Sequence, residues 1–264
     1  MKQSLFQNII VLFSGLIILF IIGPLLSMFV NTGHAELFET LHDKDVTDSI
    51  WLTLGTAFAS TLFFSVLAVP FAYLMARYDF PFKGVLQGII DLPVVIPHSA
   101  AGIALLGFIS RDSALGKFAN LFGLDFVGNA LGIGVAMAFV SIPFLINAAR
   151  DGFAAVPKRL EQAAYTLGAS PMRTFFTVSL PLAWRNILSG FIMMFARGMS
   201  EFGAVVIVAY HPMITPVLIY EYFGAFGLKY ARPVSVIFVS ISLLFFVLLR
   251  MMARKATETG RGGE

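Results

Sequence analysis

IWLTLGTAFASTLFFSVLAVPFAYLMA, residues 50–76, decides the fold class because it contains no charged residue. About 20 mostly apolar residues in a helix cross the roughly 30 Å of hydrocarbon in a bilayer, and this run exceeds that length. Of the 264 residues in the chain, 58% are hydrophobic and only 12% are charged, whereas soluble domains carry about 25% charge. The sequence therefore predicts an integral membrane protein of the all-α class.

Five further runs are apolar enough to form membrane-spanning helices. Three of them carry no charge, whereas the other two include Asp91 in one case and Arg197 with Glu201 in the other. The sequence thus predicts a polytopic protein with six spans, built as a single transmembrane domain over residues 1–264 and surrounded by membrane lipid. The five runs are residues 9–30, 84–110, 126–149, 186–210 and 233–249.

Lysine and arginine are unevenly distributed over the segments that join these runs. If both termini are cytoplasmic, twelve of these residues lie in inner segments and five in outer segments, in agreement with the excess of basic residues on the cytoplasmic side of membrane proteins. The first outer segment, residues 34–48, adds five acidic residues against one lysine. We therefore expect a multi-pass protein of the cell membrane with both termini, and the basic segment 150–185, in the cytoplasm.

The basic segment contains EQAAYTLGASPMRTFFTVSLP, residues 161–181, whose pattern is typical of two short helices that meet at a bend. Pro157 suits the first helical position, and Gly168 suits a left-handed stop. Ser170 suits the N-cap of a second helix that begins at Pro171, and Pro181 is expected to close the unit. The helical spacing of the apolar residues makes the first helix amphipathic, so its apolar side lies either on lipid headgroups or in a groove of a partner. These residues are Leu160, Ala163, Ala164 and Leu167, followed by Met172, Phe175 and Phe176 in the second helix.

The same segment resembles the cytoplasmic coupling loop of ABC importer permeases, in which a Glu-x-Ala-Ala-x-x-x-Gly start is followed by a Leu-Pro end. The resemblance implies the type I importer permease fold and a loop that binds a separate ATPase subunit. The chain has no Gly-x-x-x-x-Gly-Lys-Ser/Thr phosphate loop, so ATP and Mg are expected on that partner, and neither catalytic residues nor cofactors are expected in this chain. The residues implied for coupling are Glu161, Ala163, Ala164, Gly168, Ala169, Leu180 and Pro181.

A second resemblance narrows the expected cargo. FARGMSEFGA, residues 195–204, and DLPVVIPHSAAG, residues 91–102, are similar to helices of the oxyanion permeases for molybdate, tungstate and sulfate. Phe202 and the segments at residues 219–221 and 227–233 favour the molybdate and tungstate branch, especially its archaeal members. The resemblance implies a homodimer, two ATPase subunits and an extracellular binding protein. Sulfate is the alternative cargo, and a secondary transporter is the rival class.

Charges and prolines within the predicted spans mark a candidate translocation path or gate. Arg197 and Glu201 lie one helical turn apart, and a charge at membrane depth costs several kcal/mol unless it meets a partner or a watery cavity. They therefore neutralise each other, line the path together with Ser200 between them, or do both in different states. Pro93 and Pro97 interrupt the backbone hydrogen bonds of the third run, which is consistent with a hinge and also with an ordinary membrane helix.

Other classes of function find less support in the sequence. A net charge of +3 gives no reason to expect nucleic acid as a partner, and the absence of cysteine excludes thiolate chemistry. The residues His34, Glu36, Glu39 and His42 suggest a solvated outer loop rather than a metal site. A membrane-embedded hydrolase would need partners for His98, and the sequence indicates none, so neither His98 nor His211 is assigned a role.

Overall fold

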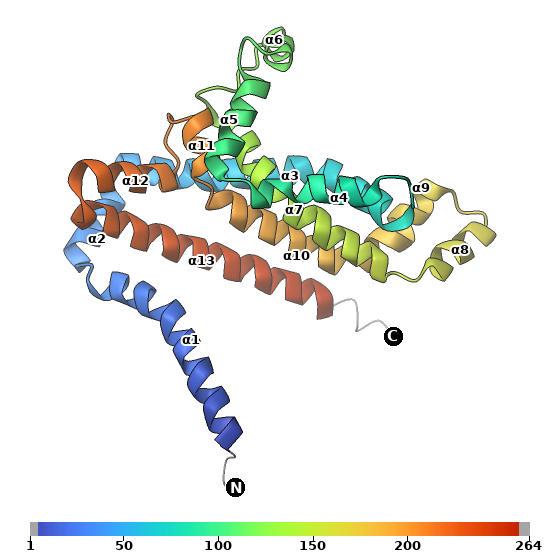
Figure 1. The fold of residues 1–264 in the computed structure, drawn as a ribbon, viewed down its shortest axis with the longest axis horizontal. Coiled ribbons are helices and arrows are strands. Elements are labelled where there is room, and N and C mark those ends of the chain that lie inside the picture. Colours follow the sequence, from blue (N-terminus) through green and yellow to red (C-terminus); the bar gives the residue numbers. More distant parts are fainter. Residues whose placement is uncertain (1–4, 259–264) are drawn as a thin grey trace.

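The computed structural model describes the backbone of residues 5–258 and the side chains of residues 6–251. Within this range the chain is helical and contains no strand, which confirms the all-α prediction (Figure 1). The helices are α1 (Leu5–Val30), α2 (His34–His42), α3 (Lys44–Arg77), α4 (Lys83–Val95), α5 (His98–Ile109), α6 (Ala114–Asn120), α7 (Ala130–Ala155), α8 (Lys158–Thr166), α9 (Pro171–Thr174), the π-helical turn η1 (Phe175–Ser179), α10 (Leu180–Met199), α11 (Gly203–Val208), α12 (Thr215–Phe226) and α13 (Leu228–Glu258).

Five helical stretches in the described range are long and apolar enough to cross a membrane, and a sixth arises if α4 and α5 form one broken span. The continuous stretches are α1, α3, α7, α13 and the helix that runs from Pro171 through η1 to Met199. The axes of α4 and α5 differ by 112°, because the chain leaves the helix at Ile96 and Pro97. The third predicted run, residues 84–110, therefore corresponds to a sharply bent pair of helices rather than to one straight span.

One predicted span has the wrong bounds. Residues 186–210 do not form one helix, because α10 begins far earlier and ends at Met199, and α11 starts only at Gly203. The backbone N–H of Ala204, in the first turn of α11, donates a hydrogen bond to the Glu201 carboxylate at 2.8 Å. The first N–H groups of a helix have no partner within the helix, and this bond gives the Ala204 N–H one. The Glu201 carboxylate therefore stabilises the break between α10 and α11 and does not lie in the middle of a span.

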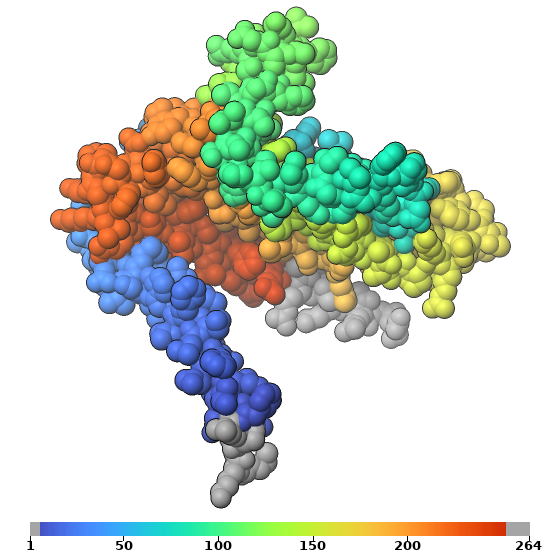
Figure 2. All heavy atoms as spheres, in the orientation of Figure 1, coloured from blue at the N-terminus to red at the C-terminus, as the bar shows by residue number. Residues whose placement is uncertain are grey.

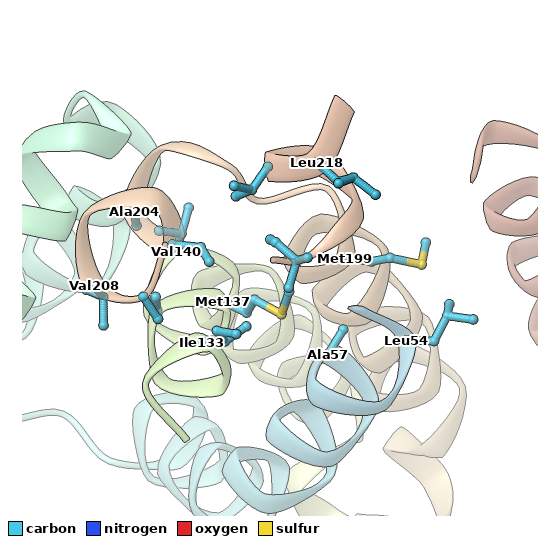
Figure 3. Packing of buried hydrophobic residues seen from close by; sticks show 14 of the residues in the cluster. Leu54, Ala57, Ile133, Met137, Val140, Met199, Ala204, Val208 and Leu218 are labelled. Atoms are coloured by element: carbon cyan, nitrogen blue, oxygen red, sulfur yellow. The ribbon is translucent and has the colours of Figure 1, made fainter. Parts of the chain in front are cut away.

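The core of the molecule is the packing of α7 between α3 and α10. Figure 3 shows Ile133, Met137 and Val140 of α7 between side chains of α3, α10 and α11. Close contact depends on small residues: a Cβ on Gly190 of α10 would lie 2.8 Å from the Cβ of Ala148 on α7. Tight packing of small residues is the usual way for membrane helices to associate, so these three helices form the scaffold that positions the rest.

α1 stands apart from this scaffold over most of its length (Figures 1 and 2). No residue of its most apolar stretch is buried, and its main contacts with the rest of the chain are made with α13. There the Arg232 guanidinium donates a hydrogen bond to the backbone oxygen of Asn31. An apolar helix exposed on all sides must be covered by lipid or by another protein within a membrane.

Candidate functional site

The bent pair of short helices predicted in the basic segment is present at one end of the bundle, where α8 and α9 project beyond α7 and α10 (Figure 1). α8 begins directly after Pro157, which occupies the N-cap rather than the first helical position. Gly168 follows α8 with φ +82°, the left-handed conformation that glycine adopts at helix ends. The Ser170 hydroxyl accepts a hydrogen bond from the Arg173 N–H, and Pro171 starts α9. The left-handed stop at Gly168 and the N-cap at Ser170 confirm the sequence prediction, whereas Pro157 lies one position before the predicted one.

Pro181 does not close this unit, contrary to the sequence prediction. The helix continues from α9 through η1 into α10, and Pro181 lies in the first turn of α10. Proline lacks an N–H, and its ring clashes with the carbonyl four residues earlier in a regular α-helix. A π-helical turn directly before it changes that hydrogen-bonding pattern, so the chain passes the proline without ending the helix.

Glu161 is buried and faces the bundle. Its Oε1 atom lies 2.8 Å from both Nε and Nη2 of Arg77 on α3 and accepts a hydrogen bond of 2.6 Å from the Ser179 hydroxyl. The Arg77 Nη2 also donates to the backbone oxygen of Val156, just after α7. Glu161 therefore ties α8 to α3 and to η1, Arg77 extends this connection to the end of α7, and the carboxylate does not face outward.

The side of the two short helices that points away from the bundle carries exposed apolar residues. We call this surface the inner apolar face. Leu167 is the most exposed, with 88% of its surface accessible. Only Phe175 of the predicted second apolar set packs into the bundle, beside Tyr73 and Phe153. Among the predicted coupling residues, Ala163, Gly168 and Pro181 are exposed, whereas Ala164, Ala169 and Leu180 are half-buried. The inner apolar face consists of Leu160, Tyr165, Leu167, Met172 and Phe176.

A second candidate site lies where α10 and the α4–α5 pair are both interrupted. The Glu201 carboxylate is fully buried, and its Oε2 atom lies 2.9 Å from Nη2 of Arg197 and 3.1 Å from Nδ1 of His98. The same Arg197 nitrogen lies within 3.0 Å of both ring nitrogens of His98. The Ser200 hydroxyl is exposed and donates to the backbone oxygen of Arg197 at 3.1 Å. The predicted pairing of Arg197 with Glu201 is thus present, and His98 joins it.

The two prolines of the predicted hinge occupy different positions. Pro97 lies in the break between α4 and α5, whereas Pro93 is buried within α4. Beyond the break, α5 packs against α11 at very short range: a Cβ on Gly102 would lie 2.9 Å from the Ala204 oxygen, and one on Gly203 would lie 2.7 Å from the His98 Cβ. Small residues therefore allow these two helices to hold His98 beside Glu201.

His98, Arg77 and Ser179 are the site residues that sequence reasoning missed. His98 is 99 residues from Arg197, and Arg77 is 84 residues from Glu161, so only the tertiary fold brings them together. A buried carboxylate signals that some cation must be near, but it does not say which one. As for metals, the residues that the structure describes include no group of three or more His, Cys, Asp or Glu side chains that could hold an ion.

Comparison with known proteins gives concordant results. Residues 68–258 match the family described as binding-protein-dependent transport system inner membrane component. The chain is 46% identical over 242 residues to the molybdate/tungstate transport system permease protein WtpB of Pyrococcus abyssi, covering 91% of this chain and 92% of that protein. The WtpB protein of Methanocaldococcus jannaschii is 43% identical over 249 residues, covering 94% and 97%. The sulfate transport system permease protein CysT of Synechocystis sp. is 28% identical over 243 residues, covering 89% and 85%.

Solved structures share the fold at low sequence identity. A chain of a bacterial ABC transporter involved in the import of the acidic polysaccharide alginate has a TM-score of 0.73 at 16% identity, covering 95% of this chain and 96% of that one. A chain of the MetNI methionine ABC transporter, in an inward-facing conformation, has a TM-score of 0.61 at 15% identity, covering 81% and 95%. The fold is thus one that ABC importers use.

Proposed function

Because this chain belongs to the family of binding-protein-dependent transport system inner membrane components, we propose that it is the membrane-spanning subunit of an ATP-driven importer of molybdate or tungstate. The relatives named for these two anions cover nearly the whole chain at more than 40% identity. In this function the anion crosses the membrane without chemical change. ATP, with its Mg, is bound and hydrolysed by a separate ATPase subunit, so the chain itself is not an enzyme.

The observation that carries this proposal is one continuous helix of 29 residues from Pro171 to Met199. Its first turns present Met172 and Phe176 of the inner apolar face, and its last turn carries Arg197. At 1.5 Å per residue it is about 40 Å long. A displacement of the inner apolar face by an ATPase would therefore be passed along this helix to Arg197 and to Glu201, which follows directly after it. The Glu161–Arg77 pair transmits the same displacement to α3.

We assign the ATPase-binding role to α8 and α9 with the basic segment 150–185, on the cytoplasmic side together with both chain termini. Gly168 provides the bend, and Ala163 and Pro181 lie on the exposed side of the unit. Helices as short as these are marginal in water by themselves, so the Glu161 anchor keeps them folded while the apolar side chains enter a groove. Burial of this face on a partner is favourable because it removes apolar surface from water.

The working assembly in this proposal is a homodimer with two ATPase subunits and an extracellular binding protein. Two copies of one coupling unit suit two ATPase copies around a two-fold axis. A second copy would also face the partly exposed side of Arg197 and close the path between the protomers. α1, which finds few neighbours within its own chain, is then covered by lipid or by that second copy.

Within each protomer we place the gate at the two helix breaks. Pro97 lies at the break before α5, Pro93 lies within α4, and Arg197, Ser200 and Glu201 lie at the end of α10. The Arg197 guanidinium offers N–H donors to a tetrahedral dianion. The Glu201 carboxylate offsets part of its charge, which keeps the site weak enough for the anion to leave.

Sulfate is the second candidate cargo, because a sulfate permease is also similar over most of the chain. The test is uptake of labelled molybdate into proteoliposomes that hold this chain, its ATPase and its binding protein. We expect uptake only when ATP is present on the side of the membrane that the ATPase faces. We also expect tungstate to compete strongly with molybdate and sulfate to compete weakly. Equal competition by sulfate would move the assignment to a general oxyanion importer. Uptake driven by a proton gradient without ATP would contradict the proposal.

A further inference from the structure

A cavity of about 390 Å³ lies at the end of the molecule opposite α8, where α1 approaches α12 and α13 (Figure 1). Its volume falls within the range of small-molecule sites, roughly 300–1,000 Å³. Among the described side chains that line it, Arg232 of α13 is the only charged one. The cavity therefore combines one cation with a largely apolar wall. The apolar side chains of this wall belong to Pro24, Met28, Ile219, Phe223 and Leu228.

The Arg232 guanidinium has no carboxylate partner among the side chains that the structure describes. Its one hydrogen bond there runs from Nη1 to the backbone oxygen of Asn31, so the N–H groups of Nε and Nη2 are available as donors. α1 contains no acidic residue. Glu221, the only acidic residue of α12, accepts a hydrogen bond from the Tyr210 hydroxyl instead. The charge and the donors of Arg232 therefore suit an anion from outside the chain.

The position of Arg232 along α13 places it at the depth of the lipid headgroups. Residues 228–251 of this helix are long and apolar enough to cross a membrane, and Arg232 is only the fifth residue of the helix. Basic side chains near the ends of such helices keep their charge at the membrane surface. Tyr220 of α12 and Tyr230 of α13 are exposed, and tyrosine is enriched at the same depth. Lipid phosphates are the anions that surround a protein there.

We propose that this cavity binds an anionic phospholipid, whose phosphate pairs with Arg232 and whose first acyl carbons cover the apolar wall. A guanidinium donates two parallel hydrogen bonds to a phosphate. The rest of the acyl chain lies along α1, where no residue of the most apolar stretch is buried by the protein. The lipid thereby joins α1 to α12 and α13. This inference depends on the membrane location of the chain and not on the cargo of the importer.

The test measures which lipid stays with the protein. The full-length chain, in the assembly in which it is purified, is mixed with equal amounts of phosphatidylglycerol and phosphatidylcholine, and native mass spectrometry counts the bound lipids. Both lipids carry a phosphate, but the choline group balances its charge. Because a hydrogen bond to a charged group is stronger than one to a neutral group, we expect phosphatidylglycerol to be retained about tenfold over phosphatidylcholine.

Substitutions of Arg232 test the role of its charge. Arg232→Gln keeps an N–H donor for the Asn31 oxygen but has no charge, so the preference for phosphatidylglycerol should disappear. Arg232→Lys keeps the charge and should retain most of the preference. Arg111→Gln is the matched control, because Arg111 is exposed and already pairs with Asp125. This control should bind phosphatidylglycerol as the wild-type protein does.

A second variant tests the cavity without changing Arg232. Ser27 of α1 lines the cavity, so Ser27→Leu places a larger side chain inside it and should lower the retention of phosphatidylglycerol severalfold. Ser14→Leu makes the same change on the exposed surface of α1, away from the cavity, and should have no effect. If the Arg232→Gln assembly cannot be purified, the comparison of these two variants decides the proposal.

Five results would overturn the proposal. They are the absence of a lipid preference in the wild-type protein, normal retention by Arg232→Gln, and equal retention by Ser27→Leu and Ser14→Leu. Displacement of the lipid by excess inorganic phosphate would assign the cavity to a free anion. Loss of self-association in Arg232→Gln with unchanged lipid would assign it to a second copy of the chain. A failure of molybdate uptake, by contrast, would overturn the proposed function and leave this inference standing.

Discussion

At the scale of single residues, two buried carboxylates organise the molecule. Glu161 is compensated by Arg77 and the Ser179 hydroxyl at the end of the bundle that carries α8. Glu201 forms an ion pair with Arg197 and lies 3.1 Å from the His98 Nδ1 atom, at the opposite end of the α10 helix. In both places a helix is interrupted or widened beside the carboxylate, by η1 near Glu161 and by the α10–α11 break at Glu201. Buried charge and irregular backbone therefore occur together, as is common where a structure must move.

The Glu161–Arg77 pair gives a prediction about stability. Glu161→Ala leaves the buried Arg77 guanidinium without its carboxylate, which costs about 3–5 kcal/mol in other proteins. We expect a lower melting temperature of the purified complex for Glu161→Ala, and recovery of most of the loss when Arg77→Met is added, because the second change removes the unpaired charge. An unchanged melting temperature for Glu161→Ala would show that the pair contributes nothing to the fold.

At the scale of helices, local chemistry could be predicted from the sequence and long-range contacts could not. Gly168 and Ser170 act through backbone conformation and capping, which depend on their immediate neighbours, and both were identified correctly. Pro181 was misread because a proline normally ends a helix, and only the π-helical turn before it lets the helix continue. The partners of Glu161 and Glu201 come from distant segments. The hydrophobic runs in the sequence indicated where the spans lie, but they did not indicate the break between α10 and α11 that Glu201 stabilises.

The contact between α5 and α11 predicts a strong dependence on one glycine. A Cβ on Gly102 would lie 2.9 Å from both the Ala204 oxygen and the Ile207 Cβ, whereas a Cβ on Gly107 of the same helix would meet nothing within 4 Å. Gly102→Val should therefore destabilise the protein by about 1–3 kcal/mol through overpacking, and Gly107→Val should change its melting temperature little. Equal melting temperatures for the two variants would mean that α5 and α11 are not packed as described.

The inner apolar face predicts a specific loss of the ATPase. Leu167 is almost fully exposed, so Leu167→Asp should leave the fold of the chain intact while placing a charge in the groove of the partner. We expect the purified variant to keep its own melting temperature but to retain far less ATPase. Leu121→Asp, an equally exposed leucine after α6, is the matched control. Full retention of the ATPase by Leu167→Asp would exclude this face as its binding surface.

At the scale of the whole molecule, one helix joins the two candidate sites, which lie at its two ends. The α9–η1–α10 helix begins at the inner apolar face and carries Arg197 in its last turn. Glu161 joins the η1 part of this helix, through Ser179, to Arg77 of α3. In the proposed function, an ATPase that moves this end acts on the proposed gate through one helix, which contains the π-helical turn η1.

The most direct test of this account uses the absence of cysteine from the sequence. A Leu167→Cys variant carries a single thiol, which can be reacted in native membranes with a short photoactivated cross-linker. The account predicts one cross-linked product, joining this chain to a nucleotide-hydrolysing subunit, and protection of the thiol from impermeant reagents added outside intact cells. Labelling of residue 167 from outside, or cross-links that never include such a subunit, would contradict it.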